Sequence, residues 1–538
     1  MDPRGTRRQE ELEDCSPASS GICLTHKRRT ATRLWCGVFL LYLPLTIGCT
    51  ATQSATPAPH NELTIGNPEG VIEGTELGSR STVVALTVET LTQLGVDGRP
   101  VPKLAESWWW DEDGRRLNVN LRAGVRFHDG TPLTADLAAD ILRAAVMRPS
   151  NRAMFTSLGD VTAIRAQGDR QLVFDLSQPS AFLPDDLELP ITHGSSTVGT
   201  GPFRLVTDDE TGIELERFPD YYLGVPKIAR VVIRPFETLR TAWTSLLRGD
   251  IDMVTDVPAD AVEFIRNDDV RVVSFERRYQ YLVAFNSRKW PLNSKIVRRA
   301  LNTAIDREAL IRSVFQGRGR PSTGPLWPKH WAYDNSIASY RFDRGLASSL
   351  LNSAGLSTEN RSGGAKKRFT FTCLVPENFS TIERIALEVQ KQLYDVGVDM
   401  QFEVVPSKDF DSRIRKGEFE AILIDMISGP AVSRSYLFWR SSKRLQGLNV
   451  FGYENAEADR LFDVMRTSRN EIAVQSAFTR LQEVLLDDPP ALFLLWNERS
   501  RAVRRDFDVV QDPVHDPADL IYTIWRWKPV EPRLALAH

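Results

Sequence analysis

Cysteine is scarce in this chain of 538 residues, with only five in total. Four of them lie within the first 49 residues, at Cys15, Cys23, Cys36 and Cys49. The rest of the chain has Cys373 alone, so no intramolecular disulfide is predicted there and a buried core must hold the fold. Cys373 alternates with Phe369, Phe371 and Val375, which indicates an inward-facing strand residue that packs rather than reacts.

Long apolar runs are also rare, and the one that stands out covers residues 34–47. It follows Lys27-Arg28-Arg29 and is too short for a transmembrane span, which predicts a secretory signal. The run ends in Gly48-Cys49, which resembles a bacterial lipobox, although Thr46 stands where that pattern prefers Leu. We expect Cys49 to become the lipid-carrying first residue of the mature chain. The alternative is an ordinary signal peptide followed by an incidental cysteine.

The segments on either side of this signal are polar. Residues 1–26 form a long leader that a misassigned start codon would explain, and residues 50–61 are small and polar with two prolines. Such a composition cannot bury a core, so residues 49–61 are predicted to be a flexible tether behind a leader and signal at 1–48. The chain is therefore expected to be exported and lipid-anchored at the outer face of the cytoplasmic membrane.

Several function classes are disfavoured by what is missing. The net charge is -3 with 25% charged residues, which gives no broad basic face for nucleic acid or anionic lipid. The seven histidines are scattered, and the sequence has no H-E-x-x-H, C-x-x-C, G-x-S-x-G or phosphate-loop motif. We therefore expect no enzyme activity, no cofactor, no metal site and no nucleic-acid partner.

Strand and helix patterns alternate along most of the body. Residues 368–375, 398–404 and 419–424 have the spacing of strands, and two helical patterns lie between them. The first of these helices is predicted to begin at Ser380 with Glu383 completing a capping box, and to end at Gly397. A β-α-β-α-β order implies a parallel sheet with covering helices.

The same order recurs at residues 231–275, so two α/β units are predicted to form two lobes with a ligand cleft between them. Residues 82–200 differ, because Asp-Gly turns separate short strands there and Thr134 is placed to cap a single helix. This segment is predicted to be an inserted α+β subdomain. It contains Trp108-Trp109-Trp110, which we expect to belong to its core.

An ordered set of short motifs resembles the bacterial extracellular solute-binding proteins of family 5, the dipeptide-, oligopeptide- and nickel-binding receptors of ABC importers. The motifs are Glu-Thr-Leu at 89–91, Pro-Lys-Leu-Ala-Glu-Ser-Trp at 102–108, Asp-Gly at 113–114, Leu-Arg-Ala-Gly-Val-Arg-Phe-His-Asp-Gly at 121–130, Gly-Thr-Gly-Pro-Phe at 199–203, Gly-Asp-Ile-Asp at 249–252, Phe-Asn at 285–286, Val-Arg-Arg-Ala-Leu at 297–301, Ala-Ile-Asp-Arg at 304–307 and a short helix at 347–355. Together they span most of residues 62–510.

The resemblance implies an α/β, two-lobed periplasmic-binding-protein-like fold (type II, cluster C) with an extra α+β subdomain in the first lobe. The predicted lobe I core is 62–86, 197–281 and 495–538, the inserted subdomain is 87–196, and lobe II is 282–494. The resemblance also implies that the chain crosses between lobes near 281–286 and returns near 488–497, and that these crossings act as a hinge.

Five residues are predicted to contact the solute. Asp425 follows a predicted strand, and in peptide-binding relatives a similarly placed Asp pairs with the amino group of the peptide; the alternative is a loop Asp that caps nearby residues. Relatives often carry Trp before this Asp, where this chain has Leu423-Ile424. Trp327 and Trp439 are predicted aromatic walls, with core packing as the alternative. Glu89 matches an acidic cleft position or a helix start, and Gly201 a tight turn with a secondary role in backbone contact.

Three functions follow as hypotheses. The first is an anchored receptor that captures short peptides and delivers them to an ABC permease and its ATPase, acting as a monomer. The second keeps the fold and changes the solute to a nickel chelate, haem or a glycan. The third is an envelope lipoprotein that no longer transports and acts as a scaffold or regulator.

Overall fold

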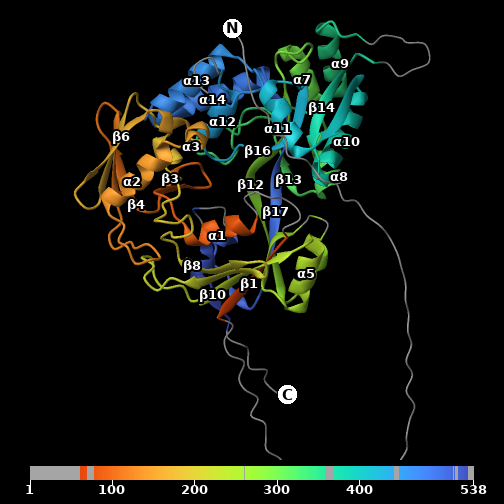
Figure 1. Ribbon diagram of the computed structural model, residues 1–538. Coiled ribbons are helices and arrows are strands. Elements are labelled where there is room, and N and C mark those ends of the chain that lie inside the picture. Colours follow the sequence, from red (N-terminus) through yellow and green to blue (C-terminus); the bar gives the residue numbers. More distant parts are fainter. Residues whose placement is uncertain are drawn as a thin grey trace, which may run out of the picture. The chain divides into compact units, whose positions relative to one another are not determined.

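Two long antiparallel strands, β12 (Val270–Phe285) and β17 (Ala491–Arg504), run through the middle of the protein (Figure 1). The predicted crossing segments lie side by side in this pair, since Tyr281 pairs with Leu495 and Leu282 with Phe493. The register of this pairing shifts between Glu276 and Gln280 and again between Tyr281 and Leu282. Residues 286–490 lie between these strands in the sequence, so the chain enters and leaves that part of the protein through them.

These strands belong to one eleven-stranded sheet in the order β15-β14-β16-β12-β17-β11-β1-β10-β9-β8, with β13 paired to β17. The other strands are β15 (Val398–Val405), β14 (Phe369–Pro376), β16 (Ala421–Ile427), β11 (Met253–Val257), β1 (Glu62–Pro68), β10 (Arg230–Phe236), β9 (Gly212–Arg217), β8 (Phe203–Asp209) and β13 (Gly319–Pro321). β14 is parallel to β15 and β16, and β1 is parallel to β10 and β11. The predicted parallel arrangement is confirmed in both halves.

The structure is a computed structural model that describes residues 61–68, 78–257, 259, 261–357, 367–377, 379–441, 448–512, 514 and 519–530. The predicted leader, signal, Cys49 and all of the tether except Asn61 lie outside these residues. None of the described helices is both long and apolar enough for a membrane span. The described residues form one compact unit, so the lobe boundaries stay a prediction.

Helices cover both faces of the large sheet. On one side lie α7 (Lys295–Thr303), α8 (Arg307–Phe315), α9 (Arg344–Ser353) and α10 (Ser380–Tyr394); other helices are α11 (Ser407–Lys416), α12 (Val432–Trp439), α13 (Ala456–Thr467), α14 (Glu471–Asp487), α1 (Ser79–Thr87), α5 (Leu239–Arg248) and α6 (Val262–Ile265). Alternate residues of β12 serve the two faces: Tyr281, Val283 and Phe285 pack towards α7–α10, whereas Leu282 and Ala284 pack towards α12–α14. Burial on both faces explains the unbroken apolar run at the end of this strand.

A separate four-stranded antiparallel sheet has the order β4-β5-β7-β6. It consists of β4 (Ala105–Trp110), β5 (Arg116–Leu121), β7 (Gln171–Leu176) and β6 (Val161–Gln167), and near it lie α2 (Ala135–Val146), α3 (Pro149–Met154), α4 (Leu183–Asp186), β2 (Thr92–Leu94) and β3 (Pro100–Pro102). We call residues 87–196 the small-sheet region. Thr134 accepts a hydrogen bond from Leu137 N, which confirms the predicted cap of α2. Trp108 and Trp110 pack against this core, but Trp109 is 44% exposed.

One local prediction is confirmed by the structure and two are wrong. Cys373 is buried in the core on the α7–α10 side, as predicted, and burial raises the pKa of its thiol. The capping box at Ser380 is wrong, because Ser380 is already the first helical residue and the preceding Phe379 makes no side-chain cap. The strand ending at residue 424 is also wrong: β16 continues to Ile427, so Asp425 lies inside the strand, opposite Tyr281 of β12.

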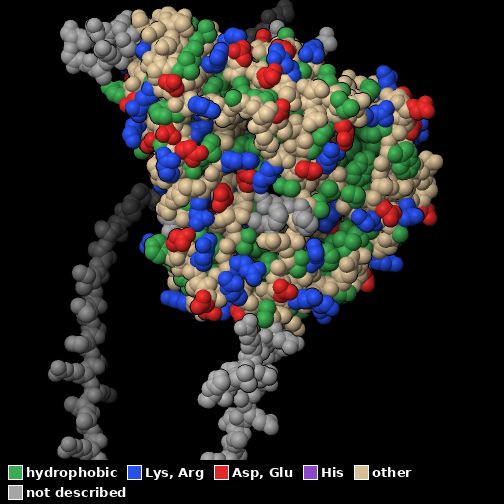
Figure 2. Space-filling view, turned by 180° about the vertical axis from the view of Figure 1, so that it is seen from behind, with side chains coloured by type: hydrophobic (Ala, Val, Ile, Leu, Met, Phe, Trp, Pro, Cys, Tyr) green, Lys and Arg blue, Asp and Glu red, His purple; other side chains and the backbone are tan. Residues whose placement is uncertain are grey.

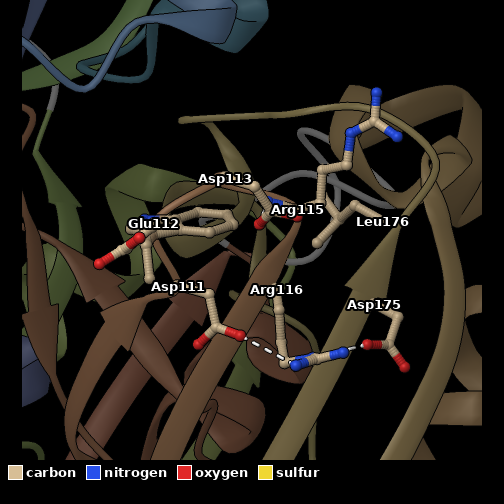
Figure 3. Close-up of a pocket in the computed structure, with 8 residues that line it drawn as sticks. Asp111, Glu112, Asp113, Arg115, Arg116, Asp175 and Leu176 are labelled. Atoms are coloured by element: carbon tan, nitrogen blue, oxygen red, sulfur yellow. Dashed lines mark hydrogen bonds and ion pairs between the residues drawn. The ribbon is translucent and has the colours of Figure 1, made fainter.

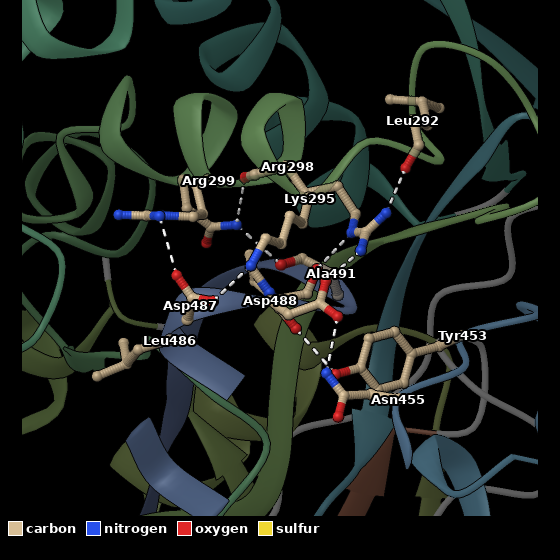
Figure 4. Close-up of polar contacts among 12 residues, drawn as sticks. Leu292, Lys295, Arg298, Arg299, Tyr453, Asn455, Leu486, Asp487, Asp488 and Ala491 are labelled. Carbon is tan, nitrogen blue, oxygen red and sulfur yellow. Dashed lines mark hydrogen bonds and ion pairs between the residues drawn. The ribbon is translucent and has the colours of Figure 1, made fainter. Parts of the chain in front are cut away.

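A polar network fixes the turn by which the chain leaves α14 and enters β17 (Figure 4). Arg298 donates to Pro489 O and Leu292 O, each at 2.8 Å, and forms an ion pair with Asp488. Asn455 donates to the other oxygen of Asp488 at 2.9 Å. Because every charge in this turn is paired, the start of β17 is held against α7.

A second buried arginine, Arg307, supports the same strand from α8. Its guanidinium donates to backbone oxygens of Ser322, Phe493 and Asn302 at 2.8–2.9 Å and to the side-chain oxygen of Asn302, and no described carboxylate pairs with it. Burial lowers the pKa of Arg307 to about 10. The residue therefore remains charged at neutral pH and satisfies several carbonyl groups at once.

We expect Arg307→Met to lower the free energy of unfolding by about 3–5 kcal/mol, because several buried acceptors lose their donor together. Arg299→Met is the matched control, since Arg299 lies on α7 in an ion pair with Asp487 at 2.9 Å and its side chain is 39% exposed. That exposed pair is worth less than about 1 kcal/mol. Urea denaturation of both variants measures the difference, and equal losses would contradict the assignment.

Candidate functional site

Charged side chains gather where β11, β12, β16 and β17 lie next to one another in the large sheet. Arg277 of β12 donates to Asp425 Oδ2 at 2.7 Å, and Arg499 of β17 donates to Asp256 Oδ2 of β11 at 2.7 Å. Tyr281 lies opposite Asp425 in the β12–β16 ladder. We call Asp256, Arg277, Tyr281, Asp425 and Arg499 the strand-crossing cluster.

The cluster is largely shielded from solvent. The exposed side-chain fractions are 4% for Arg277, 8% for Asp256, 20% for Asp425 and 21% for Arg499. Burial, and next the charge of Asp425, raise the pKa of Tyr281, so its hydroxyl stays protonated. Two acids and two bases in ion pairs leave the cluster without net charge.

Each carboxylate of the cluster nevertheless has one oxygen that is not used in its ion pair. Asp425 Oδ1 and Asp256 Oδ1 are buried and have no hydrogen-bond partner among the described residues, and the same holds for Arg499 Nε. An unmet buried polar atom costs about 1–3 kcal/mol, so such atoms usually meet a water or a ligand. The cluster can therefore receive a donor group at both acids without breaking either ion pair.

The two tryptophans predicted as cleft walls are buried. Trp327 is 4% exposed; its Nε1 donates to Val96 O at 2.8 Å and its ring meets Trp496 edge-on with centroids 4.9 Å apart. Trp439 is 1% exposed and packs between Phe451 and Phe493. Trp439 offers no surface to a solute in this arrangement, whereas Trp327 lies where the small-sheet region meets the rest of the protein.

Both carboxylate oxygens of Glu89 have hydrogen-bond or ion-pair partners within the protein. Its Oε2 accepts from Thr200 Oγ1 at 2.9 Å, its Oε1 accepts from the hydroxyls of Tyr221 and Tyr222 at 3.0 and 3.1 Å, and Lys103 Nζ lies 3.1 Å from Oε1. Glu89 is 4% exposed. These contacts join the small-sheet region to the segment at 200–222, so Glu89 has little capacity left for a solute.

Gly201 lies where only a residue without a side chain fits. A Cβ atom there would stand 2.6 Å from Leu86 O, and Gly201 N donates to Thr87 O at 3.0 Å. His128 Nε2 contacts Gly201 O at 3.0 Å, and burial lowers the pKa of this histidine. The glycine allows two backbones to approach closely, which agrees with a turn rather than with solute contact as its main role.

We expect Glu89→Ala to lower the free energy of unfolding by about 3 kcal/mol, since three hydroxyls and one ammonium lose a buried charged acceptor. Glu216→Ala is the control, because Glu216 is 46% exposed in its ion pair with Arg204 and should cost less than about 1 kcal/mol. Thermal and urea unfolding provide the measurement. Normal stability with lost solute binding would instead place Glu89 in the binding site.

Elsewhere, a polar pocket of about 650 Å³ opens beside the turn between β4 and β5 (Figure 3). Its Arg116 lies between Asp111 and Asp175, 3.0 Å from each, and Asp175 also binds Arg165. These charges satisfy one another, which makes the pocket a weaker candidate than the strand-crossing cluster.

On the face shown in Figure 2, acidic and basic side chains are interspersed.

Comparison with known proteins identifies the class. The model of the bacterial extracellular solute-binding proteins, family 5, matches residues 99–446, and the chain belongs to this family. The oligopeptide-binding protein AppA of Bacillus subtilis is 25% identical over 464 residues, covering 79% of this chain and 82% of AppA. The probable D,D-dipeptide-binding periplasmic protein DdpA of Escherichia coli is 25% identical over 435 residues, with 75% and 80% covered.

Solved structures agree on the fold. AppA of B. subtilis in complex with a nonapeptide superposes with a TM-score of 0.72 at 21% identity, covering 88% of this chain and 100% of that one. NikZ of Campylobacter jejuni in complex with Ni(L-His) gives 0.73 at 20% identity with the same coverage. The two-lobed periplasmic-binding-protein fold predicted from the sequence is confirmed, and the family consists of solute-binding proteins rather than enzymes.

Sequence reasoning named Asp425 but missed its companions Asp256, Arg277 and Arg499. One signal was present: Asp256 is a lone acid in the otherwise apolar or uncharged strand Met253–Val257. Polar residues inside buried strands are rare enough to be candidates for a site. Arg277 and Arg499 gave no such signal, because both lie in strand segments rich in charged residues.

Proposed function

We propose that this protein is the extracytoplasmic receptor of an ABC importer and that it captures short peptides at the strand-crossing cluster. The observation that carries the proposal is the pair of buried, unpartnered oxygens on Asp425 and Asp256. The amino terminus of a peptide is an ammonium group with three donors, which matches such acceptors. The peptide ligands in the names of AppA and DdpA support the same solute class.

Recognition in this form depends on the peptide's end rather than on its side chains. The ammonium group would contact Asp425 Oδ1 while Oδ2 stays with Arg277, 2.7 Å away. Such a charge-assisted bond is stronger when water is excluded. The receptor then delivers its peptide to a permease and ATPase, and the predicted lipid on Cys49 keeps it at the membrane.

One observation favours a different solute as the second candidate. Arg277 already neutralises Asp425, so the acid attracts a free ammonium less than an unpaired carboxylate does. A solute that carries both a positive and a negative charge, or a metal chelate, would not be disfavoured by a cluster that has no net charge. Among the described residues, however, no group of three or more His, Cys, Asp or Glu side chains is arranged to hold a metal ion.

Calorimetry with a library of di- to hexapeptides tests the first candidate, each peptide used with a free and an acetylated amino terminus. We expect Asp425→Asn to weaken free peptides at least tenfold, about 1.4 kcal/mol, and to leave acetylated ones unchanged. Asp399→Asn is the matched control: Asp399 is also an ion-paired strand acid, with a 21% exposed side chain, but lies on edge strand β15. No heat with any peptide rejects the peptide assignment, and equal affinity for free and acetylated peptides rejects the contact between the amino terminus and Asp425.

The predicted anchor is tested by metabolic labelling with an alkynyl fatty acid in a bacterial host. Cys49 should carry the label, and Cys49→Ser should release the protein from the membrane fraction, because one residue supplies the attachment point for the acyl chains. A labelled Cys49→Ser variant would contradict Cys49 as the site of acylation, and an unlabelled wild-type protein that is still exported would support the ordinary signal peptide.

A further inference from the structure

A buried ion pair joins the small-sheet region to helix α13. Asp160, just before β6, pairs with Arg466 of α13, and their side chains are only 9% and 8% exposed. Gln178 donates to Asp160 Oδ1 at 2.7 Å, and Arg466 Nη1 donates to the Tyr436 hydroxyl of α12 at 2.8 Å. Both charges are thus paired and further hydrogen-bonded, although the buried Arg466 Nε has no partner among the described residues.

The backbone and an aromatic contact strengthen the same junction. Ala181 N donates to Arg466 O at 2.5 Å, and the rings of Phe182 and Tyr436 meet edge-on with centroids 5.9 Å apart. Phe182 is 4% exposed and belongs to the core that α12–α14 form with the large sheet. A residue of the small-sheet region is therefore part of the core of the opposite side.

Two more contacts repeat this pattern along the interface. Asp186 of α4 accepts from Ser157 Oγ at 2.7 Å within its own region and from Ser433 Oγ of α12 at 3.0 Å across the interface. Arg434 of α12 donates to Met154 O and stacks over Phe155, 4.7 Å from the ring centroid. Burial raises the pKa of Asp186, and its hydrogen bonds to Ser157 and Ser433 lie on both sides of the interface.

The loop before β3 closes the far end of the interface. Trp327 Nε1 donates to Val96 O at 2.8 Å and Trp331 N donates to Asp97 O at 3.0 Å. Gly98 has φ +80°, and a Cβ atom there would stand 2.6 Å from Pro430 O. The two surfaces are in direct backbone contact at this point, and only glycine fits.

The interface is coupled to the strand-crossing cluster through β12. Arg278, the residue after Arg277, donates to Leu94 O at 3.0 Å, and Leu94 N donates to Glu188 Oε1 at 2.9 Å. Movement of the small-sheet region away from α12 and α13 would therefore pull on the strand that carries Arg277. Opening of this interface and contact with a solute would therefore both affect the segment of β12 that contains Arg277 and Arg278.

We propose that Asp160 and Arg466 form a latch that keeps the small-sheet region against α12 and α13 without any solute. All groups of the latch belong to this chain, so the closed arrangement does not depend on a bound molecule for its charge pairing. Closure by the chain's own residues is a separate claim from the proposed function. The further claim that solute exchange requires the latch to open rests on that function.

Hydrogen exchange and X-ray scattering on the solute-free full-length protein test the latch. The amides of Ala181 and Trp331 should exchange at least tenfold more slowly in the wild-type protein than in the Arg466→Gln variant. The variant should also show a larger radius of gyration. Arg466→Lys should retain part of the protection because it keeps the charge. Arg480→Gln is the matched control, since the exposed Arg480 of α14 pairs with Glu457 and Glu483 on its own side and makes no described ion pair across the interface.

Amides in the centre of β5, such as that of Val119, show whether a variant merely unfolds. They must stay protected in Arg466→Gln while the interface amides speed up. If they do not, Tyr436→Phe decides, because it removes one hydrogen bond to Arg466 and keeps the ring: it should speed up the Ala181 amide severalfold with Val119 unchanged. Unprotected Ala181 in the wild type, or no change in either variant, overturns the latch.

These readings use protein without solute, so they separate the two proposals. A failed peptide titration leaves the exchange result standing, and a failed exchange result leaves the binding assay standing. Where a peptide does bind, Arg466→Gln should raise its dissociation rate constant at least threefold, while Arg480→Gln leaves that rate constant unchanged.

Discussion

The pairing of β12 with β17 is the constraint on which the rest of the structure depends. Sixteen and fourteen residues long, these strands join both halves of the large sheet, and no other described pair of strands does so. The buried arginines Arg298 and Arg307 reinforce the β17 end of this pair through carbonyl groups. The strand-crossing cluster, the two apolar cores and the interface with α12 are all placed by the same two strands.

Placing charged residues on central strands has a physical consequence for recognition. Side chains on a sheet interior have little freedom, so Asp425 and Asp256 present their free oxygens in nearly fixed positions. Their ion pairs with Arg277 and Arg499 hold the other oxygens and remove the net charge. The cost of burying the acids is thereby lowered before any solute arrives, and selectivity depends on geometry more than on overall charge.

Much of the fold could be predicted because it follows local patterns. Period-two and helical spacing gave the β14–β16 unit, and Thr134 was correctly read as a cap because its hydroxyl acts within one turn. Asp425 was placed after its strand since a charged residue normally ends an apolar run; in the protein, its pairing with Arg277 lets the strand continue. Arg277 could not have been predicted as a partner, because its position depends on a register shift in the pairing of two strands more than 200 residues apart.

The latch has a consequence for how strongly the receptor holds its cargo. A receptor that is closed most of the time can bind a solute only while it is open. Its apparent association constant is therefore the intrinsic association constant multiplied by the fraction of open molecules. If one molecule in a hundred is open, a nanomolar contact surface behaves as a binder roughly 100-fold weaker. Nutrient scavenging at low concentration would then favour a weaker Asp160–Arg466 bond, and a habitat rich in the nutrient would tolerate a stronger one.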